Sequence, residues 1–118
     1  MKKVLIIDDE QRISDIYLRL LASAGLSVRC ANNAQLATSI LVREEIDLVL
    51  LDIKMPVIDG KTMFEIIEEY DPNIKIIVSS VYPIEKQKEL VPHAVDYYDK
   101  SEGSSKLLEK VKNVLAAV

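Results

Sequence analysis

Several residue types are scarce in this 118-residue chain, and each scarcity excludes a class of protein. Cys30 is the single cysteine and cannot form an intrachain disulfide, and no signal peptide opens the sequence, so we expect a protein of the reducing cytoplasm. Three glycines and four prolines are too few for a collagen-like or low-complexity chain. The apolar runs Val4–Ile7 and Leu48–Leu51 are far shorter than a membrane span, so we expect no membrane partner.

The chain also has fewer positively than negatively charged residues. Fifteen lysines and arginines stand against 19 aspartates and glutamates, which gives a formal net charge of −4. A nucleic-acid surface needs clustered cations to neutralise phosphates, so we expect no direct nucleic-acid partner. Hydrophobic residues make up 49% of the chain and charged residues 29%, as in ordinary globular domains. The length and the lack of repeats or linkers predict one domain over residues 1–118.

Short apolar runs alternate with longer amphipathic stretches along the whole chain. The runs predict strands over residues 4–7, 26–31, 48–51, 74–78 and 94–98, and a short polar helix is predicted over residues 84–91. Apolar residues at helical spacing predict the inward sides of four further helices: Ile13, Ile16, Tyr17, Leu20, Leu21 and Ala24; Leu36, Ile40 and Leu41; Met63, Ile66, Ile67 and Tyr70; and Leu107, Leu108, Val111, Val114, Leu115 and Val118. Strands that are apolar on both faces and separated by helices indicate a covered parallel sheet. We therefore predict an α/β fold, a doubly wound (βα)5 three-layer sandwich.

Polar residues follow the predicted strands at the end where open parallel sheets bind ligands. In chain order they are Asp8 and Asp9, Asp52, Ser79 and Ser80, and Lys100. If the first and third strands are neighbours, three carboxylates meet in one pocket. Clustered carboxylates repel one another, which either raises a pKa or calls for a cation, and Mg²⁺ is the hard divalent ion that suits oxygen ligands. An aspartate pair alone is also typical of a helix cap, but three acids with a lysine nearby favour a site.

These residues together resemble the receiver domains of response regulators, the phosphoacceptor family of two-component signalling. The resemblance covers the whole chain and rests on four segments: Asp8-Asp9-Glu10, the nine residues from Asp52 to Gly60 (DIKMPVIDG), the hydroxyl residues at Ser79 and Ser80, and Lys100. It implies a flavodoxin-like parallel sheet of five strands in the order 2-1-3-4-5.

The resemblance also implies a role for each candidate residue. Asp52 would be the phosphoacceptor, and Mg²⁺, or Mn²⁺ in its place, would be held by the side chains of Asp8, Asp9 and Asp52 and the backbone carbonyl of Lys54. Phosphate binding and switching would fall to Lys100, Ser80 and Tyr97. Autodephosphorylation would be modulated by Lys54 and Tyr82, where the resemblance places control of water access. As a point charge with three donors, Lys100 is suited to pair with Asp52 and then with a phosphoryl oxygen.

The sequence departs from the family pattern at two places. Ser101 follows Lys100 where the family commonly has proline, often after a cis bond; a cis bond before a non-proline residue costs about 2.5–4 kcal/mol, which favours a trans bond and a differently placed lysine. Two serines could align with the switch hydroxyl of the family. Ser80 is followed by Val81 where the family usually has a small residue, whereas Ser79 would be followed by the small Ser80. We favour Ser80 and keep Ser79 as the alternative.

The expected function is acceptance of a phosphoryl group on Asp52 from a sensor histidine kinase, a phosphotransfer protein or a small acyl phosphate. The added charge would switch the face formed by the helix at 84–91, the strand at 94–98 and the last helix, and so signal to a downstream protein or to an output domain from which the chain was excised. We expect no independent enzyme, because a phosphohydrolase would need a second acid where Lys54 stands and no glycine-rich nucleotide loop is present. The alternative is a receiver-like interaction module that works without phosphorylation.

Overall fold

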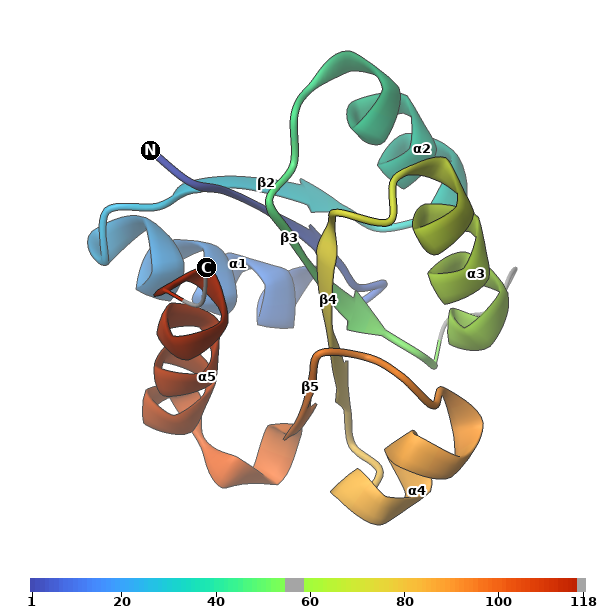
Figure 1. Cartoon of the computed structure of the whole chain (residues 1–118). Helices are drawn as coiled ribbons and strands as arrows, with labels where there is room; N and C mark the ends of the chain where they lie inside the picture. Colours follow the sequence, from blue (N-terminus) through green and yellow to red (C-terminus); the bar gives the residue numbers. More distant parts are fainter. Residues whose placement is uncertain (55–58, 117–118) are drawn as a thin grey trace.

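The computed structural model describes residues 1–54 and 59–116 (Figure 1). The strands are β1 (Lys3–Ile7), β2 (Ser27–Ala31), β3 (Leu48–Asp52), β4 (Lys75–Ser80) and β5 (Asp96–Asp99). The α-helices are α1 (Gln11–Ser23), α2 (Ala34–Arg43), α3 (Gly60–Tyr70), α4 (Ile84–Leu90) and α5 (Ser104–Ala116), and a 3-10 turn, η1, covers Lys100–Glu102. Outside the described residues lie Met55, Pro56, Val57 and Ile58 of the nine-residue motif and Val118 of the last predicted stripe. None of the helices in the two described ranges is long and apolar enough to cross a membrane.

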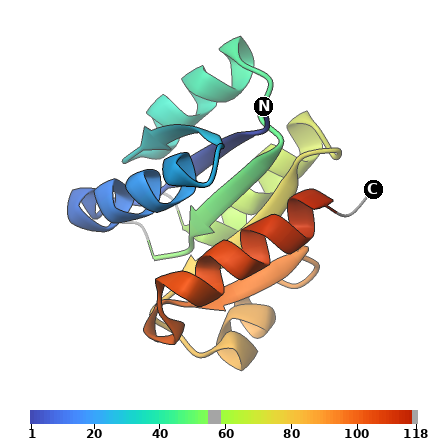
Figure 2. The ribbon, with the colours of Figure 1, turned by 90° about the vertical axis from the view of Figure 1, so that its left-hand side faces the viewer.

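The five strands form one parallel sheet in the order β2-β1-β3-β4-β5, which confirms the predicted fold. Helices α1 and α5 cover one face, seen in front of the sheet in Figure 2, and α2 and α3 cover the other (Figure 1). Helix α4 packs beside the edge strand β5. Because all strands run in the same direction, their carboxyl ends lie at one end of the molecule, and the residues that follow them meet there.

Alternate residues of each strand build the two halves of the core. In β1, Leu5 and Ile7 pack toward α2 and α3, whereas Val4 and Ile6 pack toward α1 and α5. All four side chains are at most 1% exposed, and burying a side chain of this size contributes about 1.5–3 kcal/mol. The same alternation places Tyr97 and Tyr98 on opposite faces of β5, as predicted. Apolar burial on both faces therefore holds the strand ends, and the site, in place.

Polar caps and one glycine fix where α2 and α3 begin. The side chains of Asn33 and Asp59 each accept a backbone N–H of the first helical turn at 2.8 Å. Gly60, the first residue of α3, lies directly against the backbone that follows Asp52. A Cβ atom at Gly60 would lie 2.2 Å from the Cα atom of Ile53, so only glycine fits this approach.

Four side chains predicted to point inward are exposed instead: Ile16, Leu36, Ile66 and Tyr70. Each helix buries only a narrow strip against the sheet, which in α1 consists of Ser14, Tyr17 and Leu21. The four exposed residues lie on the flanks of their helices, where no further layer covers them. The prediction that these side chains belong to the core was wrong.

Strand β4 extends further than its apolar run. Ser79 and Ser80 belong to the strand rather than to the loop after it, because they pair with Tyr98 and Asp99 of β5. The predicted strand ends at Val78 because the two serines are polar. Backbone pairing with the neighbouring strand outweighs this polar character.

Candidate functional site

Three carboxylates lie together at the carboxyl ends of β1 and β3. One oxygen from each of Asp8, Asp9 and Asp52 lies within 4.8 Å of the others. The strands are direct neighbours with Ile7 opposite Leu51, so the residues that follow these positions are side by side. Asp8 and Asp52 are only 2% and 3% exposed, whereas Asp9 faces the solvent. The acids predicted to converge therefore do so, with one of the three open to the outside.

Backbone N–H groups orient the two buried carboxylates. The N–H of Glu10 donates to Oδ1 of Asp8, and the N–H of Lys54 donates to Oδ1 of Asp52, both at 2.9 Å. Each hydrogen bond closes a tight turn between residues two apart in the chain. The second oxygen of each carboxylate, Oδ2, faces the ammonium group of Lys100.

Lys100, at the start of η1, reaches across the sheet end into the acid cluster. Its Nζ atom lies 2.9 Å from Oδ2 of Asp8 and 3.5 Å from Oδ2 of Asp52. The lysine thus pairs more closely with Asp8 than with Asp52, its expected partner. The bond to Ser101 is trans, as are the other peptide bonds within residues 1–54 and 59–116.

Burial and crowding shift the titration of both partners. Burial raises the pKa of Asp52 to about 6. The N–H of Lys54 and the charge of Lys100 oppose that rise, and the neighbouring charges of Asp8 and Asp9 add to it. For Lys100, burial works against the charged form, but the hydrogen bond with Asp8 and the charge of Asp52 outweigh it and raise the pKa. At neutral pH, the ion pair between Lys100 and a predominantly ionised Asp52 is therefore maintained.

The charge balance of the cluster fits a divalent cation. With all groups ionised, the three clustered carboxylates face one ammonium, which leaves an excess of two negative charges, and the carboxylate of Glu10, 3.9 Å from the ammonium, adds a further negative charge. The donors are all oxygen, the ligand type of Mg²⁺ and Mn²⁺ rather than of zinc or copper, and Asp9 gives an ion access from solvent. A cavity of about 320 Å³ opens here, lined by Asp9, Glu10, Asp52, Lys54, Val81 and Lys100. At about 30 Å³ per water molecule, it has room for an ion that keeps several waters.

The two candidate switch serines face opposite sides of the sheet. Ser79 pairs in register with Asp52 on one side and Tyr98 on the other, so its side chain lies on the face of Asp52. Its hydroxyl is buried without a hydrogen-bond partner among the described residues. The Oγ atom of Ser80 accepts the N–H of Tyr82 at 3.2 Å. Ser80 thus contacts the segment that follows β4 on the face away from Asp52, so the geometry favours Ser79, the alternative, as the switch hydroxyl.

Tyr97 is buried, and its side chain points toward α4 and the residues that follow α4. Its hydroxyl donates to the carbonyl of Val91 and accepts the N–H of Ala94. The ammonium of Lys88 lies 5.9 Å from the centre of its ring. Tyr97 therefore ties β5 to the residues that follow α4 and does not contact the acids.

Lys54 and Tyr82, predicted to control water access, lie against each other. The Nζ atom of Lys54 is 5.9 Å from the centre of the Tyr82 ring, within the range of a cation–π interaction. Lys54 and Val81 also line the acid cavity. The two predicted modulators thus form one contact across the rim of the site.

Two residues near the site were not singled out by the sequence analysis. Gln87 of α4 is fully buried, although the predicted helix is polar. Its spacing from Ile84 and Val91 (three and four residues) could have shown that it shares their inward face. Tyr17 of α1 packs edge-on against Tyr98 with ring centres 6.3 Å apart, and burial together with the Tyr98 hydroxyl raises its pKa. No sequence signal distinguishes Tyr17 from an ordinary core residue.

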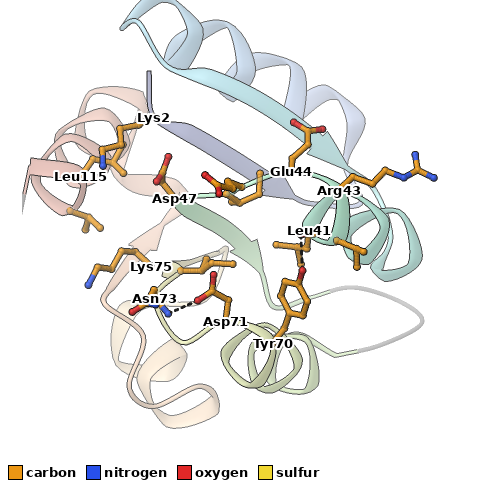
Figure 3. Close-up of a pocket in the computed structure, with 15 residues that line it drawn as sticks. Lys2, Leu41, Arg43, Glu44, Asp47, Tyr70, Asp71, Asn73, Lys75 and Leu115 are labelled. Atoms are coloured by element: carbon orange, nitrogen blue, oxygen red, sulfur yellow. Dashed lines mark hydrogen bonds between the residues drawn. The ribbon is translucent and has the colours of Figure 1, made fainter.

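A second cavity, of about 450 Å³, lies at the opposite end of the sheet (Figure 3). Its polar groups serve the fold. The Tyr70 hydroxyl donates to the carbonyl of Leu41 at 3.3 Å, and Asp71 accepts the N–H of Asn73 at 3.0 Å. Asp47 likewise accepts the N–H of Lys3 at 2.8 Å. Although this cavity is larger, the acid pocket is the better candidate site because its charges converge.

Sequence comparison identifies the family of the chain. The family model of the response regulator receiver domain matches residues 4–112, a range that includes the acid cluster and Lys100. A protein-glutamate methylesterase/protein-glutamine glutaminase 1 from Paramagnetospirillum magneticum is 39% identical over 80 residues, which are 66% of this chain and 21% of that relative. The match therefore spans about a fifth of the relative's length.

Similar structures extend the likeness over nearly the whole chain. The response regulator protein TrrA from Thermotoga maritima, solved in complex with Mg²⁺-BeF, is 32% identical with a TM-score of 0.87, and the match covers 97% of this chain and 99% of that chain. TrrA solved in complex with the histidine kinase ThkA is 31% identical with a TM-score of 0.85, over 98% of this chain and 99% of that chain.

Proposed function

The chain belongs to the response regulator receiver family, and we propose that it accepts a phosphoryl group on Asp52 in a Mg²⁺-dependent reaction. The observation that carries this proposal is the cluster of Asp8, Asp9 and Asp52 within 4.8 Å, with Lys100 3.5 Å from Asp52. Transfer to a carboxylate requires the negative charges of both reactants to be offset. The ammonium of Lys100 and a cation held by the carboxylates would offset them. We further propose that residues 1–118 act as a single receiver domain and a signalling module.

Asp52 is the proposed nucleophile. One carboxylate oxygen forms a bond to phosphorus while the bond from phosphorus to the donor's leaving atom breaks, and that atom keeps the electron pair. The pKa of about 6 leaves the carboxylate predominantly ionised, and so nucleophilic, at neutral pH. The hydrogen bond from the N–H of Lys54 holds the carboxylate in one orientation.

The metal ligands we propose are the carboxylates of Asp8, Asp9 and Asp52 and the backbone carbonyl of Lys54. When bound, Mg²⁺ would neutralise charge on the transferred phosphoryl group and orient the donor. Asp9 is the exposed acid and the first that an ion from solvent would meet. Asp8 is buried and already paired with Lys100, so we propose that it acts partly through water.

Lys100 and Ser79 are the proposed phosphate-binding groups, because Ser79 rather than Ser80 lies on the face of Asp52. The ammonium of Lys100 already lies between two carboxylates, so it needs only a small displacement to pair with a phosphoryl oxygen on Asp52. The Ser79 hydroxyl, which is buried without a partner among the described residues, would donate to another phosphoryl oxygen and draw the end of β4 inward. Tyr97, which joins β5 to the end of α4, would pass this change to the face formed by α4, β5 and α5.

The donor we propose is a sensor histidine kinase or a phosphotransfer protein, with a small acyl phosphate as a substitute in vitro. The complex of TrrA with the histidine kinase ThkA supports this class of partner. The complex of TrrA with Mg²⁺-BeF supports beryllofluoride as a phosphoryl analogue for this chain. The switched face would then bind a downstream protein or an output domain.

The deciding experiment is the intact mass of the protein after incubation with acetyl phosphate. We expect the wild type to gain one phosphoryl group in the presence of Mg²⁺ and none after chelation of the metal. Asp52→Asn should gain none under either condition. Asp15→Asn, the same substitution at an exposed acid of α1, should behave as wild type.

An adduct that persists in Asp52→Asn would move the acceptor to another residue. If no adduct forms with acetyl phosphate or a phosphoramidate, and Mg²⁺ does not bind, the phosphorylation-independent interaction module would replace this proposal.

A further inference from the structure

Gln87 is a buried polar residue in the middle of α4 that the proposed reaction does not use. None of its surface is exposed, although the helix sequence IEKQKEL is otherwise rich in charge. Burying a side-chain amide is unfavourable unless its polar atoms find partners. The partners of Gln87 therefore indicate what its burial achieves.

The amide nitrogen of Gln87 joins two segments of the site. Its Nε2 atom donates to the carbonyl of Tyr82 at 2.7 Å and to the carbonyl of Tyr98 at 2.9 Å. Tyr82 lies in the β4–α4 segment (residues 81–83), directly after the candidate switch serines. Tyr98 lies in β5, two residues before Lys100. We call these two hydrogen bonds the Gln87 latch.

The latch is continuous with Ser80. The N–H of Tyr82 donates to Oγ of Ser80, while the carbonyl of Tyr82 accepts from Gln87. Both backbone groups of Tyr82 are therefore engaged, one by Ser80 and one by α4. If the Ser79 hydroxyl, on the face of Asp52, is drawn toward a phosphoryl group, the adjoining Ser80 has to carry Tyr82 with it or lose that bond, and either change strains the bond to Gln87.

The latch is also incomplete. The Oε1 atom of Gln87 is buried without a hydrogen-bond partner in the part of the chain that the structure describes. An amide that is desolvated on both atoms but bonded through only one gives a small net stabilisation. Such a contact can hold one arrangement of a segment and still yield to a competing charged ligand.

We propose that Gln87 is a positioning residue that holds the β4–α4 segment, and Ser80 with it, in the arrangement adopted without a phosphoryl group. This inference rests on the proposed function, because it concerns the regulation of the same site. The latch opposes the inward movement of the end of β4, where Ser79 and Ser80 lie, and so lowers the affinity of the site for a phosphoryl group or its analogue. Removing the latch raises that affinity.

The test is Gln87→Met, which keeps the length and apolar contacts of the side chain but removes both donors. With Mg²⁺ and beryllofluoride as the probe, titration calorimetry should show binding on the order of tenfold tighter than in wild type, the effect of losing one or two hydrogen bonds. Gln35→Met, the same substitution at an exposed glutamine of α2, should leave the affinity unchanged. A residue that merely supported the packing of the site would give the opposite result, a weaker affinity.

A wild-type measurement covers the case in which Gln87→Met does not fold. By NMR, the side-chain amide hydrogens of Gln87 and the N–H of Tyr82 should exchange slowly in the free protein and faster once beryllofluoride is bound. Unchanged exchange on binding would overturn the latch.

The two proposals fail in different ways. If the wild type does not bind beryllofluoride at all, the proposed function fails, and with it the regulatory role of Gln87. If the wild type binds and Gln87→Met binds equally or less well, the latch alone fails and the phosphoacceptor role stands.

Discussion

Among single residues, Asp52 combines two opposing influences. Its carboxylate lies 3.5 Å from the ammonium of Lys100, which favours the charged form. Burial and the neighbouring charges of Asp8 and Asp9 outweigh that attraction, so the pKa rises to about 6. Keeping Asp52 ionised in the folded protein therefore lowers the free energy of unfolding. The poor solvation of this carboxylate suits the role of nucleophile that we propose for Asp52.

We predict that Asp52→Asn is more stable than wild type at pH 7 in metal-free buffer, by roughly 1–3 kcal/mol. The pKa of Asp52 in the folded protein, about 6, lies above its ordinary value of 3.8. Between these pH values the folded state binds more protons than the unfolded state, so the stability of the wild type falls as the pH rises through this window. The neutral amide avoids that loss.

Urea denaturation between pH 4 and pH 7 checks this prediction. The stability difference between Asp52→Asn and wild type should shrink as the pH falls toward 4. Asp15→Asn, at an exposed acid, should show no such trend. A difference that stays constant over the whole range would contradict the raised pKa.

A second prediction at this scale concerns the contact of Tyr82 with Lys54 at the rim of the site. Tyr82→Ala removes the ring that contacts Lys54, a residue of the cavity lining, so under our proposal water should reach the acyl phosphate more easily. We expect the lifetime of phosphorylated Asp52 to shorten several-fold, measured as the decay of the phosphorylated mass after the donor is removed. Tyr70→Ala, at a 53% exposed tyrosine of α3, is the matched control. Equal lifetimes in Tyr82→Ala and wild type would show that Tyr82 does not limit access.

Among the elements, α3 is positioned by one very close contact. Its first residue, Gly60, donates its N–H to the carbonyl of Ile53 at 3.2 Å, and the space for a Cβ atom is filled by Ile53. Ile53 directly follows Asp52, so the same contact sets where the nucleophile lies relative to α3. The close contact with Ile53 therefore explains why the last position of the nine-residue motif is glycine.

We predict that Gly60→Ala destabilises the protein by about 1–3 kcal/mol, because the added methyl group overlaps the backbone of Ile53 and one of the two segments has to move. Chemical denaturation measures the loss, and acetyl-phosphate labelling should also slow as Asp52 shifts. The matched control is Gly103→Ala. Its Cβ would meet no atom within 4 Å, so any loss there comes from backbone strain at a φ of 94° and should leave labelling unaffected. Normal labelling in Gly60→Ala would contradict this link between α3 and the nucleophile.

Helix α4 is the shortest of the α-helices among the described residues. It is seven residues long, and its inward contacts come from Ile84, Gln87 and the following Val91. Short helices are marginal without tertiary contacts, so α4 depends on these side chains and on the Gln87 latch. An element held in this way suits a segment that moves when the site changes charge.

For the whole molecule, the parallel sheet brings together charges from distant parts of the sequence. Lys100 pairs with Asp8 across a separation of 92 residues and with Asp52 across 48. The clustered acids repel one another, and the fold has to hold them together against this repulsion. A cation that binds the folded state and not the unfolded chain therefore stabilises the entire domain.

We predict that Mg²⁺ raises the melting temperature of the wild type. The free energy of unfolding should increase by about 1.4 kcal/mol when free Mg²⁺ is about tenfold above its Kd. Asp9→Asn should lose most of this increase, because it removes the exposed acid of the cluster. The control Asp15→Asn should keep it, and chelation should reverse it in every case. Thermal unfolding with an equal ionic strength of NaCl separates specific binding from screening; an equal increase with NaCl would contradict a metal site.

Local sequence patterns and the family resemblance are enough to predict the fold class and to propose the residues of the site. Apolar runs such as Val4–Ile7 predict buried strands because a sheet covered on both faces needs apolar side chains at every position. Acids placed directly after two such runs predict a pocket because parallel strands end at one edge. The family pattern supplied the strand order, which local periodicity does not contain.

The partners of these residues depend on how the segments pack against one another. The closer pairing of Lys100 with Asp8 depends on where η1 lies relative to β1, and the exposure of Ile16, Leu36, Ile66 and Tyr70 depends on how narrow a strip each helix buries. The burial of Gln87 depends on two backbone carbonyls, of Tyr82 and Tyr98, that come together only when α4 docks on β5. Local sequence sets the preferences of a segment, but contacts between segments depend on the distances that the packed sheet imposes.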